Sequence, residues 1–229
     1  MGTSSARRGP TTGLWRAAKR TATRYLSPEG EGAVTAREVV AKYLAALEEA
    51  PGHVTRLAVF RFTRKVGQDL GAFWAEVHSV GWEETLQDRG LAPLGQIDVA
   101  VLATTLSGVM AGGGGGLEEA VVRTAMALVL REAMNSGDKV APAQLVRQFL
   151  AAALSLRLVL DLGEPLEAAA GSYKRLKYGI EQIKELIESD APGVDTHRDP
   201  PTTSAHWQGL PGWTWVTEMM TTLMARLGQ

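Results

Sequence analysis

Four histidines are the side chains of this 229-residue sequence best suited to acid–base or metal chemistry: His53, His78, His197 and His206. A zinc site on a helix needs a second ligand three or four positions away, and no two of these histidines have that spacing. His197 and His206 lie nine residues apart in a proline-rich segment. We therefore expect structural or solvated histidines, no metal site and no cofactor.

Five consecutive glycines, residues 112–116, are the other pattern that could serve chemistry, as a phosphate-binding loop. A P-loop ends in Gly-Lys-Ser/Thr, whereas Leu117, Glu118 and Glu119 follow here, and their carboxylates would repel phosphate. The run therefore predicts a flexible connection before a helix. Further adjacent acidic pairs, Glu48-Glu49 and Glu83-Glu84, fit helix ends or solvated faces. An active site assembled only by the fold stays open as an alternative.

The absence of cysteine excludes several classes of site. Disulfides, thiolate nucleophiles and cysteine-ligated zinc or iron–sulfur centres all need it. No apolar run reaches the roughly 18 to 20 residues that span a bilayer, and no apolar segment follows the basic N-terminus as in a secretory signal. We expect a cytoplasmic protein without membrane contact, and a binding subunit rather than an enzyme.

The charge of the chain is uneven. Of 24 basic residues, six lie in the first 24 positions, and the first acidic residue is Glu29. The rest of the chain carries 18 basic and 25 acidic residues. A basic end on an acidic body suggests an anionic partner such as nucleic acid, and the alternative is that the arm only aids solubility.

Two segments could dock a partner. In the first, arginines of the N-terminal segment could hold phosphates while Trp15 or Tyr25 stacks on bases; the alternative places both rings in the core. In the second, Trp207, Trp213 and Trp215 gather in the last 23 residues, and tryptophan is a favoured interface anchor. The alternative there is that the tail packs on the body of its own chain.

Most of the chain that positions these candidate residues has sequence patterns typical of helices. Thr35 and Glu38 form a capping-box pattern before an apolar helix that ends at Pro51. The clearest amphipathic stripe follows, with steps of three and four residues; its members are Val59, Phe62, Val66, Leu70, Phe73, Val77 and Val80. Residues 14–26 and 117–135 also predict helices, with Glu118 and Glu119 complementing the dipole of the second.

The remaining segments complete an all-α prediction. Residues 97–110 are almost wholly apolar, and their length favours a buried helix over a strand. Pro142 suits a helix start before a core-forming run over residues 143–160, and Pro165 is expected to open another helix to about Ser189. We predict an extended arm over residues 1–13, a single helical domain of about seven or eight helices over 14–189, a Pro-rich linker over 190–212 and an amphipathic helix over 213–229.

The first residues resemble a known family. Met1, Gly2, Thr3, Ser4 and Ser5, followed by Gly9 and Pro10, resemble the start of the B subunit of the Qat antiphage defence systems. A second match is the glycine run with Leu117, Glu118, Glu119, Ala120 and Arg123. The alanine-rich helical character is similar as well.

The resemblance implies both partners and a role for the arm. The partners would be a QueC-like enzyme (similar to the deazaguanine synthase of queuosine biosynthesis), an ATPase and a TatD-like nuclease. The QueC-like enzyme would modify the N-terminus with a deazaguanine group, which needs Met1 removed and a thin arm. Gly2, Thr3, Ser4, Ser5, Gly9 and Pro10 are then the modification and docking residues. The alternative is a helical nucleic-acid-binding protein that uses the basic N-terminal segment.

Overall fold

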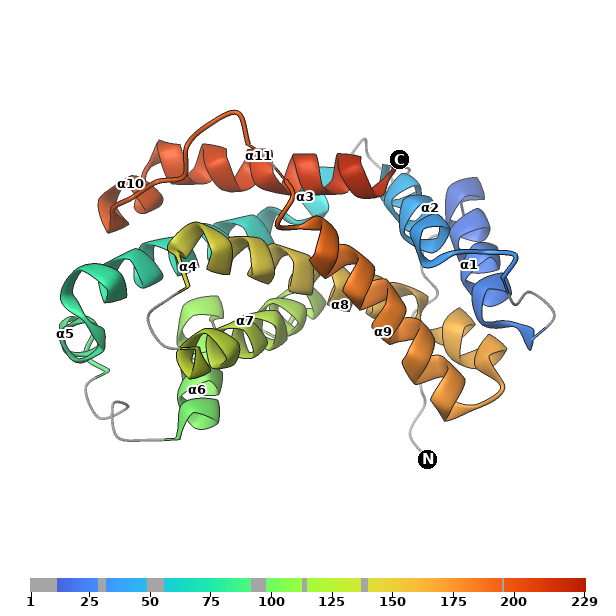
Figure 1. Cartoon of the computed structure of the whole chain (residues 1–229), viewed down its shortest axis with the longest axis horizontal. Coiled ribbons are helices and arrows are strands. Elements are labelled where there is room, and N and C mark those ends of the chain that lie inside the picture. The colour runs from blue at the N-terminus through green and yellow to red at the C-terminus, as the bar shows by residue number, and fades with distance from the viewer. Residues whose placement is uncertain are drawn as a thin grey trace. The chain divides into compact units, whose positions relative to one another are not determined.

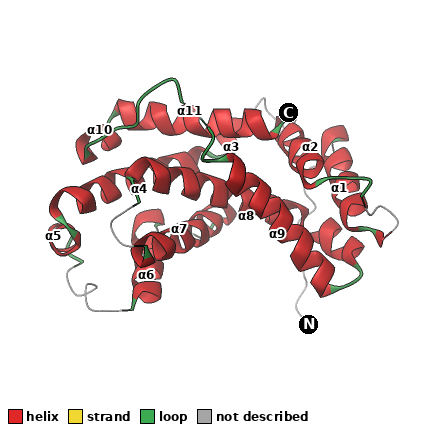
Figure 2. Ribbon diagram, in the orientation of Figure 1, coloured by secondary structure: helices red, strands yellow, loops and turns green. Residues whose placement is uncertain are grey.

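The computed structural model describes residues 12–28, 32–48, 56–91, 98–112, 115–136, 140–194 and 196–229. Within these residues all regular structure is helical (Figure 2), which confirms the predicted all-α class. The described residues form eleven helices, nine of them with seven or more residues. They are α1 (Gly13–Leu26), α2 (Ala36–Glu48), α3 (Arg56–Val59), α4 (Arg61–Val80), α5 (Trp82–Asp88), α6 (Val99–Ala111), α7 (Leu117–Asn135), α8 (Pro142–Ala170), α9 (Tyr173–Asp190), α10 (Ser204–Gln208) and α11 (Leu210–Leu227).

The chain divides into two compact units. Unit 1 consists of Met1–Val59, Leu158–Leu186 and Leu227–Gln229. Unit 2 consists of Phe60–Arg157 and Ile187–Arg226. Each unit combines segments that are far apart in the sequence. This partition arises because packing joins apolar faces whatever their distance along the chain.

In unit 1, α1 and α2 pack through an aromatic contact. Thr12 caps α1 by accepting a hydrogen bond from the Trp15 backbone N–H at 3.5 Å. The Trp15 ring is buried and meets Tyr43 of α2 edge-to-face, with 5.9 Å between ring centroids. The buried Tyr43 hydroxyl donates to Asp161 of α8 at 2.9 Å. The core alternative for Trp15 is therefore the one that the structure adopts.

The predicted capping box at the start of α2 is confirmed. The Thr35 backbone N–H donates to the Glu38 carboxylate at 2.7 Å, and the Glu38 N–H donates to the Thr35 hydroxyl at 3.2 Å. Each residue thus satisfies a backbone donor that the first helical turn leaves without a partner.

Unit 2 is organised around α4 and the first half of α8. The predicted stripe is buried on α4 from Val66 to Val77, and Val80 at the helix end is 42% exposed. Its first member, Val59, lies in the separate short helix α3, because the helix is interrupted at Phe60. Phe149 and Leu150 of α8 approach Gly67 of α4, where no side chain intervenes. Figure 1 shows α11 running alongside α4. Residues 143–160 supply much of the core, as predicted.

Three predicted elements differ from the structure. Pro165 does not open a helix: it lies inside α8, and α9 starts only at Tyr173, after Gly171 at φ 64°. Proline lacks the N–H of one intrahelical bond, and the packed α8 continues despite that loss. The 190–212 linker contains α10, and the last helix starts at Leu210 rather than at Trp213.

The apolar segment predicted over residues 97–110 is helical and corresponds to α6, but this helix is not fully buried. Val101 and Val109 are 53% and 56% exposed. Apolar residues lie both on the face of α6 that packs on α7 and on its outer face. Composition alone does not show which of these residues are buried. Among the described residues, no helix combines the length and the apolar character needed to cross a membrane.

Candidate functional site

The predicted modification and docking residues of the arm lie outside the described residues. These are Gly2, Thr3, Ser4, Ser5, Gly9 and Pro10. The described chain starts with Thr12, the cap of α1, so the arm leads directly into a helix of unit 1. The prediction for the arm thus stays a prediction.

The three C-terminal tryptophans pack against their own unit. Trp207 and Trp215 are fully buried and meet edge-to-face at 5.3 Å. Trp213 is partly exposed, and the Arg64 guanidinium lies 4.7 Å from the centroid of its ring. The alternative that this tail packs on its own chain therefore holds for Trp207 and Trp215, because both rings fill the core and leave no face to a partner.

Arg64 lies at the centre of this packing. Its side chain is almost fully buried and donates to the Thr217 hydroxyl of α11 at 2.9 Å. Burial lowers the pKa of Arg64, and nearby Arg61 lowers it further, while Glu118 raises it. A guanidinium stacked on an indole ring and bonded to the same helix fixes α11 against α4.

The described histidines lie apart from one another and in different local settings. His78 is exposed on α4 beside Trp74, and His206 lies on the short α10. The backbone N–H of His197 donates to the Glu218 carboxylate. Within the described residues no group of three or more His, Cys, Asp or Glu side chains converges, and His53 lies outside them.

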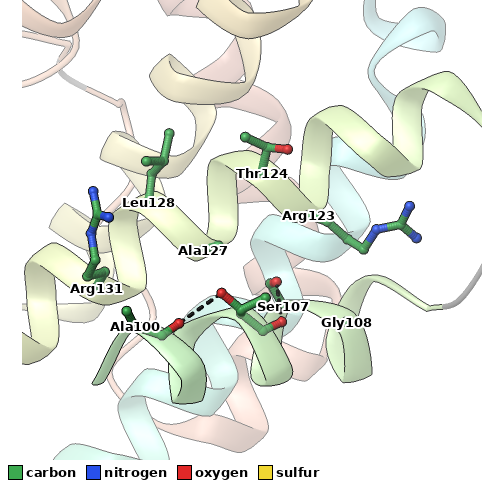
Figure 3. Close-up of a pocket in the computed structure, with 9 residues that line it drawn as sticks. Ala100, Ser107, Gly108, Arg123, Thr124, Ala127, Leu128 and Arg131 are labelled. Carbon is green, nitrogen blue, oxygen red and sulfur yellow. Dashed lines mark hydrogen bonds between the residues drawn. The ribbon is translucent and has the colours of Figure 1, made fainter. Parts of the chain in front are cut away.

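A groove of about 470 Å³ lies between α6 and α7 where the two helices pack together in unit 2. Ala100, Thr104 and Gly108 form its α6 wall, and Ala127 and Leu128 belong to α7. Figure 3 shows Arg123 and Arg131 at its two ends. The Thr104 hydroxyl donates to the Ala100 carbonyl at 2.8 Å, so it is occupied within its own helix.

The residues after the glycine run hold this hairpin together. Glu118 accepts from the backbone N–H and the hydroxyl of Thr63, both at 3.2 Å, which ties α7 to α4. Glu119 accepts from the Gly116 N–H at 2.8 Å and caps α7. Arg123 donates to the Gly112 carbonyl at 3.1 Å, across the turn. The charged residues of the mid-chain pattern thus cap α7 and join it to neighbouring segments.

A second groove, of about 650 Å³, lies in unit 1 where the end of α1 meets the start of α9. Tyr25, Lys174, Arg175 and Tyr178 line it, with backbone from residues 170–172. The Tyr25 hydroxyl donates to the Gly179 carbonyl at 3.3 Å. Burial raises the pKa of Tyr25, and the nearby Tyr178 raises it further, so this hydroxyl stays protonated.

This groove was not predicted from the sequence. The available signal was a cluster of three basic residues flanked by two tyrosines over 173–178. What the sequence alone could not show is that Tyr25, over 150 residues earlier, completes the wall.

Comparison with protein families then identifies the chain. The family model of the Qat anti-phage system associated protein QatB matches residues 55–192. The chain belongs to the QatB family. No curated protein and no solved structure gives a match.

The QatB match covers helices α3 to α9 completely, including the α6–α7 groove and the glycine turn. It includes Glu118, Glu119 and Arg123, which carried the mid-chain resemblance. It includes neither the arm nor α10 and α11. The QatB family is therefore established from the helical body, independently of the N-terminal residues that first suggested it.

Proposed function

We propose that this protein is a non-catalytic subunit of a Qat antiphage complex, and that its arm docks into a QueC-like partner and is modified there with a deazaguanine group. Membership of the QatB family carries the proposal. The partners that go with it are the QueC-like enzyme, an ATPase and a TatD-like nuclease.

The chemistry of the N-terminus supports the arm as the modified segment. Removal of Met1 depends on a small second residue, and Gly2 meets that condition. The α-amine then exposed at Gly2 is a nucleophile in its uncharged form. Thr3, Ser4 and Ser5 are small enough to enter a narrow pocket and can hydrogen-bond there through hydroxyls and backbone.

A non-catalytic role is supported by what the described polar groups do. Glu118, Glu119 and Arg123 are engaged in capping and in joining helices. Arg64 fixes α11, and Asp161 accepts from Tyr43. Charged groups held in such contacts position elements rather than a reacting substrate.

Intact-mass analysis after coexpression with the QueC-like partner tests the proposal. We expect loss of Met1 and a mass increase that fragmentation assigns to Gly2. A Gly2→Leu variant retains Met1 because its second residue is large, and it should carry no adduct. Ser5→Ala keeps Gly2 free and should remain modified. An unmodified Gly2 beside a partner that is active on its free substrate would refute the proposal.

A further inference from the structure

The start of α9 carries an unusual arrangement of charge. Its first residues are Tyr173, Lys174, Arg175, Leu176, Lys177 and Tyr178, and its first turn holds no acidic residue. The N-terminus of a helix has a partial positive charge, so cations there are unfavourable without a compensating anion. Ser172 caps the helix by accepting from the Arg175 N–H at 3.3 Å, and Lys177 pairs with Glu181 one turn further along at 3.8 Å.

These side chains form a wall of the groove in unit 1. Lys174, Arg175 and Tyr178 line it from α9, and Tyr25 and Leu26 line it from α1. The two helices approach closely at Gly179, where an added Cβ would lie 2.3 Å from the Leu26 side chain. The groove is thus built by a specific helix contact and not by an isolated helix end.

Tyr178 presents an open aromatic face in this groove. Its side chain is 63% exposed even though α9 packs on α1 one residue further along. Exposed tyrosine beside lysine and arginine is the combination that binds single strands, with cations at the phosphates and the ring under a base.

The surroundings favour an extended polyanion over a single small anion. Arg16, Arg20 and Arg24 are exposed on α1, in the same unit. Unit 1 contains 13 basic and 10 acidic residues, although the whole chain has a net charge of −1. Positive charge is therefore concentrated in the unit that holds the groove.

We propose that the groove between α1 and α9 binds single-stranded nucleic acid, with Lys174 and Arg175 at phosphates and Tyr178 stacked on a base. This goes beyond the proposed role of the arm and does not depend on it. An acidic peptide would satisfy the cations but would make no use of the open ring.

The test is fluorescence anisotropy of the full chain with a labelled 20-nucleotide oligothymidine at 50, 100 and 200 mM salt. We expect binding that weakens with salt. Tyr178→Ala should weaken it about tenfold, because one base loses its stacking on the aromatic ring. Lys174→Gln should lower the slope of log affinity against log salt by about 0.7, the value for one phosphate contact on a single strand.

Two matched variants on the same helix separate the groove from general charge. Tyr173→Ala removes a 79% exposed tyrosine outside the groove, and Lys177→Gln removes one positive charge outside it. Both should retain at least half of the wild-type affinity. All four variants should show the wild-type unfolding temperature, because the altered side chains are solvent-accessible.

Several results would overturn the proposal. One is no binding at 50 mM salt, and another is an equal loss in Tyr173→Ala and Tyr178→Ala. Displacement of the oligonucleotide by polyglutamate at equal charge would assign the groove to an acidic peptide. Binding of thymidine monophosphate as tight as that of the oligonucleotide would assign it to a free nucleotide. None of these readouts depends on Gly2, so failure here leaves the modification proposal intact.

Discussion

Two glycines one turn apart on α4 show how strictly packing constrains single residues. An added Cβ at Gly71 would lie 2.3 Å from the ring of Trp207, which is fully buried. At Gly67 the nearest atom, in Phe149, would be 3.4 Å away, an ordinary van der Waals contact. Gly71 thus allows the Trp207 ring to pack directly on the helix backbone, whereas Gly67 leaves room for a methyl group.

We predict opposite effects of alanine at these two positions. Gly71→Ala should lower the free energy of unfolding by about 1–3 kcal/mol, because the indole must move within a packed core. Gly67→Ala should be neutral or stabilising by up to about 1 kcal/mol, since alanine favours the helix. Urea unfolding of both variants measures this. A Gly71→Ala variant as stable as Gly67→Ala would show that Trp207 is not packed on α4 as described.

At the scale of elements, hydrogen bonds between residues close in the sequence fix where helices begin, and the sequence pattern predicts these hydrogen bonds. Thr35 and Glu38 start α2, and Glu119 starts α7. At Glu38, the hydrogen bonds from the Thr35 backbone and hydroxyl lower the pKa of the carboxyl, and the charges of Arg24 and Lys42 lower it further. A cap of this kind makes the stability of its helix depend on pH.

We predict that the contribution of Glu38 disappears in acid. A carboxyl whose pKa is lowered by folding stabilises the fold above its unfolded pKa and loses this effect as pH falls through the folded value. Glu38→Gln should therefore be less stable than wild type at pH 7, and this difference should shrink as the pH falls below the ordinary pKa of a glutamate. Urea midpoints measured from neutral pH into acid give the difference. In a Thr35→Ala background the difference at pH 7 should be smaller; a difference that stays the same at every pH would contradict the assignment.

At the scale of the whole molecule, the family match and the proposed arm occupy different parts of the chain. The match begins at residue 55, whereas the arm is residues 1–13. The two units draw on segments from both halves of the sequence. Folding and partner docking can therefore be tested separately, because the core residues that the structure describes begin at Trp15, after the deleted part of the arm.

We predict that deletion of residues 2–10 leaves folding intact and abolishes antiphage defence. The deletion stops before Thr12, so the cap of α1 and the buried Trp15 are retained. The unfolding temperature should stay within about 2 °C of wild type, as for changes that touch no core contact. Plaque assays with the complete system measure defence. Wild-type protection by the deletion variant would remove the arm from the mechanism.

The sequence by itself determined the helical class, the capping box at Thr35, the stripe of α4 and the QatB resemblance. These depend on contacts within a few residues or on motif identity, which are visible along the chain. Only the tertiary structure decided that α8 continues through Pro165, that Trp207 and Trp215 are core residues, and that Tyr25 meets the start of α9. Those outcomes depend on which apolar faces meet, and residues more than 100 positions apart carry no local signal of their partner.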